Sequence, residues 1–142
     1  MKLNSIIIII LALAAILNCS NQDNPRTVVK QFVASVLADD STAVESLVDW
    51  DSMIKARLEE MSPEDSTKAL RYYREQFLSS LLGDGEKRQY YRNSQIVIGK
   101  GEIENGRADV ELSFIDRQTG VQNYTKVVLR RMQDSWKIVH YY

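Results

Sequence analysis

The spacing of the apolar residues changes once along this chain, close to Gly83-Asp84-Gly85. Upstream of these residues, apolar side chains recur at every third or fourth position, which is the period of a helix that packs on a core. Downstream they alternate with polar side chains, as in a strand with one buried face. Helices followed by strands favour an α+β domain, in which helices cover one face of an antiparallel sheet. We therefore expect this architecture.

Three helices are predicted before the change in spacing. Asn24-Pro25 is typical of a helix start, because asparagine caps the first turn and proline suits its first position, so we expect a helix over residues 25–38. A short second helix is expected over residues 43–48 and leads to Trp50. Another helical turn or two is expected after Trp50. The third starts at Ser62-Pro63 and carries an apolar stripe formed by Leu70, Tyr73, Phe77, Leu78 and Leu81.

Turn signals divide the second half into four predicted strands. Asn105-Gly106 is typical of a two-residue hairpin turn, because both residues accept a positive φ angle. Gln133-Asp134 is predicted to form the last turn, also with two loop residues. The expected strands cover residues 91–103, 107–114, 121–132 and 135–142.

Pairing across the Asn105-Gly106 turn predicts the register of the first hairpin. It sets Ala108 opposite Ile103 and Val110 opposite Gly101. Gly99 and Gly101 are then expected on the buried face of the first strand, where missing side chains permit a sharp bend. The sheet is therefore expected to curve around a helix.

Two stretches of the predicted domain resemble a known superfamily. They are Val28-Val29-Lys30-Gln31-Phe32 leading to Ala38-Asp39-Asp40, and Ser135-Trp136-Lys137-Ile138 in the last strand. With the order of elements, they resemble the cone-shaped proteins related to nuclear transport factor 2, ketosteroid isomerase and scytalone dehydratase, which include small lipoproteins of unknown function. The resemblance implies three N-terminal helices packed on a curved four-stranded antiparallel meander. None of the catalytic signatures of the superfamily's enzymes maps onto this sequence.

The first residues of the chain are typical of a secretion signal. Met1-Lys2 is followed by an apolar run over residues 6–17, which is too short to cross the roughly 30 Å of a bilayer core as a helix. Asn18-Cys19 then completes a sequence that resembles the lipobox of bacterial lipoproteins, although Ile16 and Asn18 differ from the commonest residues. An ordinary signal peptide that leaves Cys19 as a free thiol is the less favoured alternative.

The lipobox resemblance implies how the chain is organised and where it is found. Residues 1–18 form the signal peptide, Cys19 carries acyl chains such as palmitate, and residues 19–24 include the polar tether. Two or three chains hold a protein on a membrane far more firmly than one. A single α+β domain over residues 25–142 is then expected beside the cell membrane or the outer membrane, after export from the cytoplasm.

Composition narrows the function classes. The chain has 18 Lys and Arg residues against 19 Asp and Glu residues, so no basic surface directs it to nucleic acid. Its single cysteine cannot form an intramolecular disulfide, and the fold must be held by its core. No set of side chains stands at the spacing of a metal site, and no motif predicts a cofactor.

Five side chains are predicted to line a pocket inside the cone: Trp50, Tyr73, Phe114, Trp136 and His140. Aromatic rings with one polar atom suit a concave, mostly apolar site. By strand alternation, the only histidine, His140, shares a face with Trp136 and Ile138. We favour a structural histidine on the packed sheet, because one histidine does not make a catalytic group.

Two functions are carried forward. The first is a non-catalytic binding module in the cell envelope, which holds a small apolar ligand or docks an envelope protein. The second is an isomerase-like or dehydratase-like enzyme, in which His140 would be the base and a tyrosine hydroxyl the electrophile. The oligomeric state is not predicted by any feature of the sequence.

Replacement of the predicted lipidation site tests the anchor. Cys19→Ala removes every acyl chain while leaving the domain unchanged, so we expect the variant to be lost from the membrane fraction. Metabolic labelling with a fatty-acid analogue, followed by fractionation, measures both properties. Equal labelling of variant and parent, or retention of both in the membrane, would contradict lipidation at this residue.

Overall fold

The computed structural model of the chain describes residues 24–58 and 63–142. The predicted signal peptide, Cys19 and most of the tether lie outside the described residues. The described helices are α2 (Pro25–Ala38), α3 (Ser41–Leu47), α4 (Trp50–Leu58), α5 (Pro63–Leu81) and α6 (Glu86–Asn93). The strands are β1 (Ser94–Ile98), β2 (Glu102–Glu104), β3 (Arg107–Asp116), β4 (Gln122–Met132) and β5 (Ser135–Tyr141). None of the described helices has both the length and the apolar character needed to cross a membrane.

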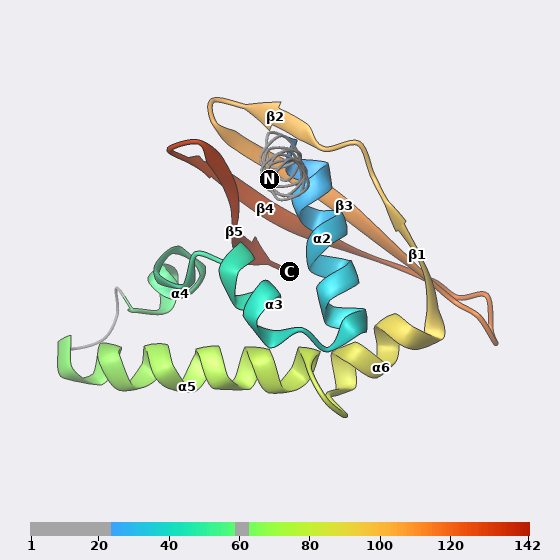
Figure 1. Ribbon diagram of the computed structural model, residues 1–142, viewed down its shortest axis with the longest axis horizontal. Coiled ribbons are helices and arrows are strands. Elements are labelled where there is room, and N and C mark those ends of the chain that lie inside the picture. The colour runs from blue at the N-terminus through green and yellow to red at the C-terminus, as the bar shows by residue number, and fades with distance from the viewer. Residues whose placement is uncertain (1–23, 59–62) are drawn as a thin grey trace, which may run out of the picture.

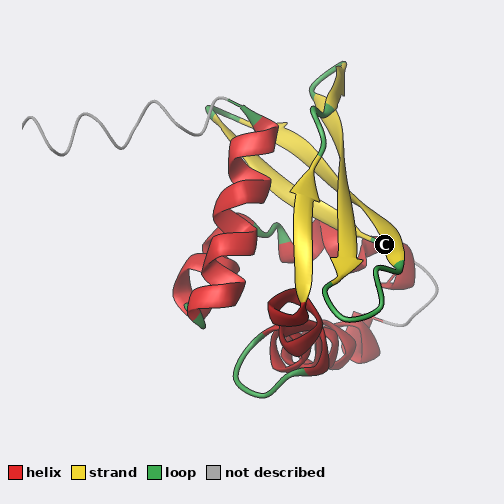
Figure 2. Cartoon of the chain, turned by 90° about the vertical axis from the view of Figure 1, so that its right-hand side faces the viewer, coloured by secondary structure: helices red, strands yellow, loops and turns green. Residues whose placement is uncertain are grey.

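The strands form one antiparallel sheet, and the helices pack against it (Figure 1). β3 lies between β4 on one side and both β1 and β2 on the other, while β5 pairs with the far edge of β4. Figure 2 shows α2 running along one face of the sheet and α5 crossing below its lower end. The predicted α+β architecture is therefore confirmed.

Helix α2 has the predicted bounds. The Asn24 side chain accepts a hydrogen bond of 2.9 Å from the backbone N–H of Arg26, and Pro25 occupies the first turn. The helix ends at Ala38, and the next residue, Asp39, caps it with a left-handed φ of 62°. Its apolar face is buried as the helical spacing predicts. Local sequence signals are enough to define this element.

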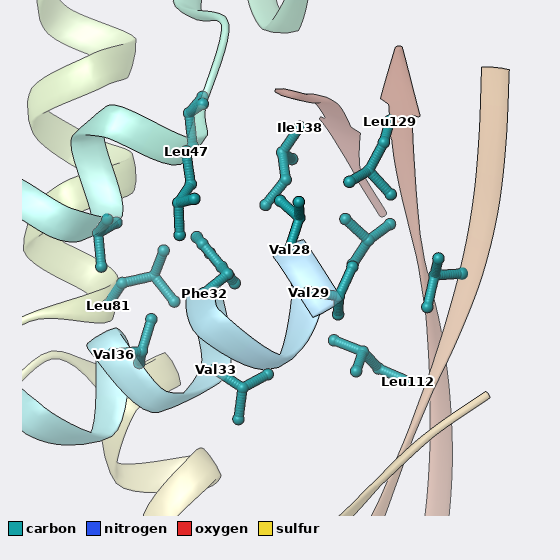
Figure 3. Packing of buried hydrophobic residues seen from close by; sticks show 14 of the residues in the cluster. Val28, Val29, Phe32, Val33, Val36, Leu47, Leu81, Leu112, Leu129 and Ile138 are labelled. Carbon is teal, nitrogen blue, oxygen red and sulfur yellow. The ribbon is translucent and has the colours of Figure 1, made fainter. Parts of the chain in front are cut away.

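The core lies between α2 and the facing side of the sheet (Figure 3). Phe32 is fully buried between the neighbouring helices and the strands. The other members are mostly branched aliphatic side chains, which have well-defined rotamers and fill the space between helix and sheet. They include Val28, Val29, Val33, Val36, Leu47, Leu81, Val110, Leu112, Leu129 and Ile138. Trp136, which was predicted to line a pocket, is 4% exposed and belongs to this core.

Helix α6 was not predicted, and its last three residues, 91–93, were expected to begin the first strand. Its sequence is almost entirely polar, so no apolar spacing indicates a helix there. Arg88 holds it in place by donating hydrogen bonds to the carbonyls of Val36, Leu37 and Gly83, at 2.9, 3.1 and 2.7 Å. The helix then buries Tyr91 in the core. Contacts with residues distant in sequence therefore override the local pattern.

The first predicted strand is also divided in two, so the sheet has five strands where four were expected. β1 and β2 both pair with β3, and the residues between them leave the ladder at Gly101, which has a φ of 72°. The predicted pairing of Ile103 with Ala108 is confirmed. Gly99 and Gly101 are only partly buried, because the β2–β3 hairpin extends beyond the helices that cover the rest of the sheet (Figure 2).

The last strand contains an irregularity that the sequence does not predict. The Gln133-Asp134 turn has two loop residues as expected, and Leu129 pairs with Ile138. Beyond that pair the register shifts, so that Val128 pairs with His140 and Val139 is the extra residue of a β-bulge. The predicted alternation is wrong after Ile138. His140 is exposed, and Tyr141 takes the inward position instead.

Candidate functional site

A cavity of about 360 Å³ lies between α4, α5 and the end of β5. Three side chains of α4, four of α5, Lys87 of α6 and two residues of β5 line it. The lining residues are Trp50, Met53, Ile54, Tyr73, Gln76, Phe77, Ser80, Lys87, His140 and Tyr141. This volume falls in the range of small-molecule sites, and the lining combines six aromatic or apolar side chains with four polar ones.

The backbone brings the start of α4 beside β5. The Asp49 N–H donates a hydrogen bond of 2.9 Å to the Ile138 carbonyl, and Val48 forms a parallel bridge with Ile138. These contacts cover the free edge of β5, which would otherwise expose unpaired backbone groups. Trp50 follows at once as the first residue of α4. The β5 edge therefore positions Trp50 at the cavity.

Three aromatic rings form a continuous wall. Trp50 and Phe77 meet edge to face with their centroids 5.7 Å apart, and Phe77 and Tyr141 do the same at 6.0 Å. Tyr141 also packs on Phe32 of the core, at 6.2 Å. Edge-to-face pairs are favourable by about 0.5–1.5 kcal/mol beyond the area they bury. The wall is thus anchored in the hydrophobic core.

Tyr141 is further held by a second tyrosine. Its hydroxyl shares a hydrogen bond of 2.6 Å with the hydroxyl of Tyr91 on α6. Burial raises the pKa of Tyr91 well above its usual range, and the neighbouring Tyr141 raises it further. Burial also raises the pKa of Tyr141, although the hydrogen bond from Tyr91 opposes part of this shift. Both phenols are therefore neutral at physiological pH.

Two cations lie over the aromatic wall, in different states of pairing. The Arg74 guanidinium lies 5.3 Å from the Trp50 ring and forms an ion pair with Glu45. The Lys87 amine lies 4.9 Å from the Tyr141 ring and 5.5 Å from the Phe77 ring. Burial lowers the pKa of Lys87, and the adjacent charge of Glu86 opposes part of the shift. Within the described part of the chain, no carboxylate forms an ion pair with Lys87.

One buried donor is left without a partner. The Trp50 Nε1–H is fully covered, and no acceptor among the described residues lies within hydrogen-bond distance of it. A buried donor that makes no hydrogen bond costs about 1–3 kcal/mol. Such groups are uncommon in folded proteins, and they call for an explanation where they occur. Here the unpaired donor belongs to a residue that lines the cavity.

The predicted pocket residues divide into two groups. Trp50, Tyr73 and His140 lie at the cavity. Phe114 is 3% exposed and packs on Tyr90 and Tyr91, with ring centroids 5.2 and 5.0 Å away. Trp136 is likewise part of the buried core. Phe114 and Trp136 support the walls of the domain from inside and do not contribute to the cavity lining.

His140 stands at the rim of the cavity. Its ring is exposed and packs against Tyr142, with centroids 4.2 Å apart at an interplanar angle of 71°. No described carboxylate or hydroxyl group makes a hydrogen bond to it. Without a partner that orients the ring and stabilises its charged form, the histidine lacks the arrangement that general-base catalysis usually requires. No three metal-ligating side chains gather anywhere in residues 24–58 and 63–142.

Three important lining residues were not predicted for the pocket: Phe77, Lys87 and Tyr141. Phe77 follows Tyr73 by four positions on α5, a spacing that places both on one helix face. The helical period could therefore have indicated it. Lys87 could not be found, because α6 itself has no apolar signal, and Tyr141 turns inward only through the bulge at Val139.

The fold and the cavity define an α+β domain with an aromatic pocket beside its last strand. No model of a known protein family matches the sequence, and no curated protein matches it either.

The Tyr91–Tyr141 pair predicts a pH dependence of stability. Because the folded state keeps both phenolic protons after unfolded tyrosines ionise, stability should fall as the pH rises above about 10. Replacing both residues with phenylalanine removes the two hydroxyls together and should flatten this fall. Chemical unfolding at a series of alkaline pH values measures it.

Lys87 affects the pH dependence of stability in the opposite direction. Because its pKa is lowered in the folded state, stability rises with pH until lysines of the unfolded chain lose their protons. Lys87 is present in both the parent and the double variant. The difference between their pH profiles of stability therefore reports the effect of the two tyrosines. Tyr124→Phe, at a residue that is 63% exposed, is the matched control and should keep the parental slope. An identical fall in the double variant would show that the pair is not buried in solution.

Proposed function

We propose that this protein is a lipid-anchored, non-catalytic binding module of the cell envelope, which holds a small ligand in the cavity between α4, α5 and β5. The observation that carries the proposal is the aromatic wall of Trp50, Phe77 and Tyr141 beside that cavity. Aromatic side chains already held by their neighbours bind an apolar ligand without losing much conformational freedom. The wall is therefore suited to binding before any ligand arrives.

The position of the cavity is compatible with an anchor on Cys19. Figures 1 and 2 place the start of α2 and the β2–β3 hairpin at one end of the molecule and α5 at the other. The Arg26 guanidinium fixes the first end by donating hydrogen bonds of 3.1–3.2 Å to the Ile98 carbonyl. A tether that ends at Asn24 would leave the α5 end, with its cavity, open to the envelope.

We also propose that the domain is related to the cone of nuclear transport factor 2 and ketosteroid isomerase. Two features support this relationship. Helices pack on an antiparallel sheet, and a cavity lies between α4, α5 and the end of β5. Fold alone does not carry function. The relationship therefore adds nothing to the choice between a binding module and an enzyme.

The geometry of the polar groups favours binding over catalysis. His140 lies at the rim, and the Tyr141 hydroxyl is occupied by Tyr91. An isomerase or dehydratase would need a base and a proton donor that converge on one enclosed point. The Tyr141 hydroxyl, bonded to Tyr91, is therefore not free to serve as the proton donor beside His140.

Binding can be tested with a neutral aromatic compound and a variant that fills the cavity. We expect 4-benzoylbenzamide to bind the full lipidated chain in phosphatidylcholine nanodiscs, and Ser80→Leu to weaken binding about tenfold by occupying the cavity. Isothermal titration calorimetry, corrected for the heat with empty nanodiscs, measures the affinity.

Ser79→Leu is the matched control on the same helix. Both serines donate a hydrogen bond to the carbonyl three residues earlier, at 2.9 Å for Ser79 and 2.7 Å for Ser80. Ser79 is exposed and does not line the cavity, so its variant should bind like the parent. No binding to the parent, or equal loss in both variants, would rule out this cavity as the site.

A further inference from the structure

The charges around the cavity are unbalanced. Its lining includes Lys87 and His140 but no aspartate or glutamate. The acid nearest to the amine in sequence, Glu86, is exposed and influences Lys87 only through space. The cavity therefore presents a positive charge without a negative partner in its wall.

The contrast with Arg74 shows that this imbalance is particular to Lys87. Arg74 lies over the other end of the aromatic wall, above Trp50, and Glu45 neutralises it. Lys87 lies over Phe77 and Tyr141, where the rings offer only their π faces to the amine. Ring faces attract a cation but do not replace the hydrogen bonds that an ammonium makes in water.

From this geometry we infer that the cavity binds a small organic acid, whose apolar body lies against the aromatic wall and whose single anionic group pairs with the Lys87 amine. The inference rests on the proposed function and specifies the class of its ligand. A cation would be repelled, and a neutral apolar molecule would leave the amine unpaired. The Lys87 side chain is itself exposed at the cavity, and the desolvation that lowers the pKa of its amine is a cost that a bound anion would offset.

The remaining polar groups of the lining fit one acidic group better than several. The Gln76 amide donates a hydrogen bond of 2.7 Å to the Tyr72 hydroxyl, and the Ser80 hydroxyl donates to the Phe77 carbonyl. The Tyr141 hydroxyl is bonded to Tyr91. Of the lining groups that remain, Lys87 carries the cationic amine, and the Trp50 Nε1–H is a single neutral donor in the same lining. A phosphate or a dicarboxylate would bring more charge than one amine can neutralise.

The test compares two compounds of almost the same shape, 4-benzoylbenzoate and 4-benzoylbenzamide, on the full lipidated chain in nanodiscs of neutral phosphatidylcholine. The carboxylate should bind about tenfold more tightly than the amide. Lys87→Met keeps the apolar stem but removes the charge, so it should abolish this advantage while binding of the amide stays within about twofold. Lys87→Arg should retain the advantage.

Lys100→Met is the control for overall charge, because Lys100 is an exposed residue between β1 and β2 and does not line the cavity. It should leave both affinities unchanged. If the amide binds and Ser80→Leu weakens it, but the carboxylate has no advantage or keeps it in Lys87→Met, the inference is overturned and the proposed function stands. Failure of both compounds to bind the parent would overturn both. Circular dichroism of each variant identifies any that has lost its fold.

Discussion

The β-bulge at Val139 is the feature on which the site depends. Two residues of β5 oppose one of β4 at that point, and the inward and outward positions exchange beyond it. Without the bulge, regular alternation would turn Tyr141 to the outer face and His140 towards the helices. The bulge reverses this arrangement. The cavity consequently has a phenol in its wall and an imidazole only at its rim.

The residue before the bulge links three parts of the molecule. The Ile138 side chain is fully buried in the core, its pairing with Leu129 continues the ladder, and its carbonyl accepts the Asp49 N–H. Because Trp50 follows Asp49 directly, the same strand edge positions both ends of the aromatic wall. Packing of Tyr141 on Phe32 and its hydrogen bond to Tyr91 then connect this wall to α2 and α6. A change in the β5 register would therefore disturb the whole site at once.

The two ends of the aromatic wall differ in whether the cation that lies over them has a carboxylate partner. The cation over Trp50 has a carboxylate partner from α3, whereas the cation over Tyr141 comes from a helix that supplies no partner for it. The neighbouring Arg88 of α6 is fully used in binding the carbonyls at the ends of α2 and α5. Adjacent basic residues of one short helix therefore serve different purposes, Arg88 in structure and Lys87 at the cavity.

Elements set by residues adjacent in the sequence could be predicted. Elements that depend on contacts with residues far along the chain could not. The bounds of α2 follow from the cap at Asn24-Pro25 and from the helical spacing of its apolar residues. The hairpin at Asn105-Gly106 is predicted for the same reason, and both residues have positive φ angles, 48° and 74°. In contrast, α6 depends on Arg88 and on the buried Tyr91, and its eight residues include too few apolar side chains to predict a helix packed on the core.

The same distinction holds for the candidate site. Trp50 and Tyr73 lie on helices whose apolar faces are apparent in the sequence, and both line the cavity. In the sequence, the bulge is indicated only by two successive apolar residues, Ile138 and Val139, which interrupt strict alternation. Both are buried in the structure. A buried pair of this kind is also compatible with the end of a strand, so the inward turn of Tyr141 could not be inferred.

The central claim is that the cavity between α4, α5 and β5 binds a small organic acid. Photo-crosslinking tests it most directly, because 4-benzoylbenzoate reacts with nearby C–H bonds and the labelled residues can be identified by mass spectrometry. Methionines are preferred targets, and the described residues contain two in contrasting places. Met53 lines the cavity, while Met132 is 42% exposed at the β4–β5 turn. The account predicts labelling of Met53 that Ser80→Leu suppresses. Labelling confined to Met132 or to the exposed outer face of the sheet, unchanged in Ser80→Leu, would contradict it.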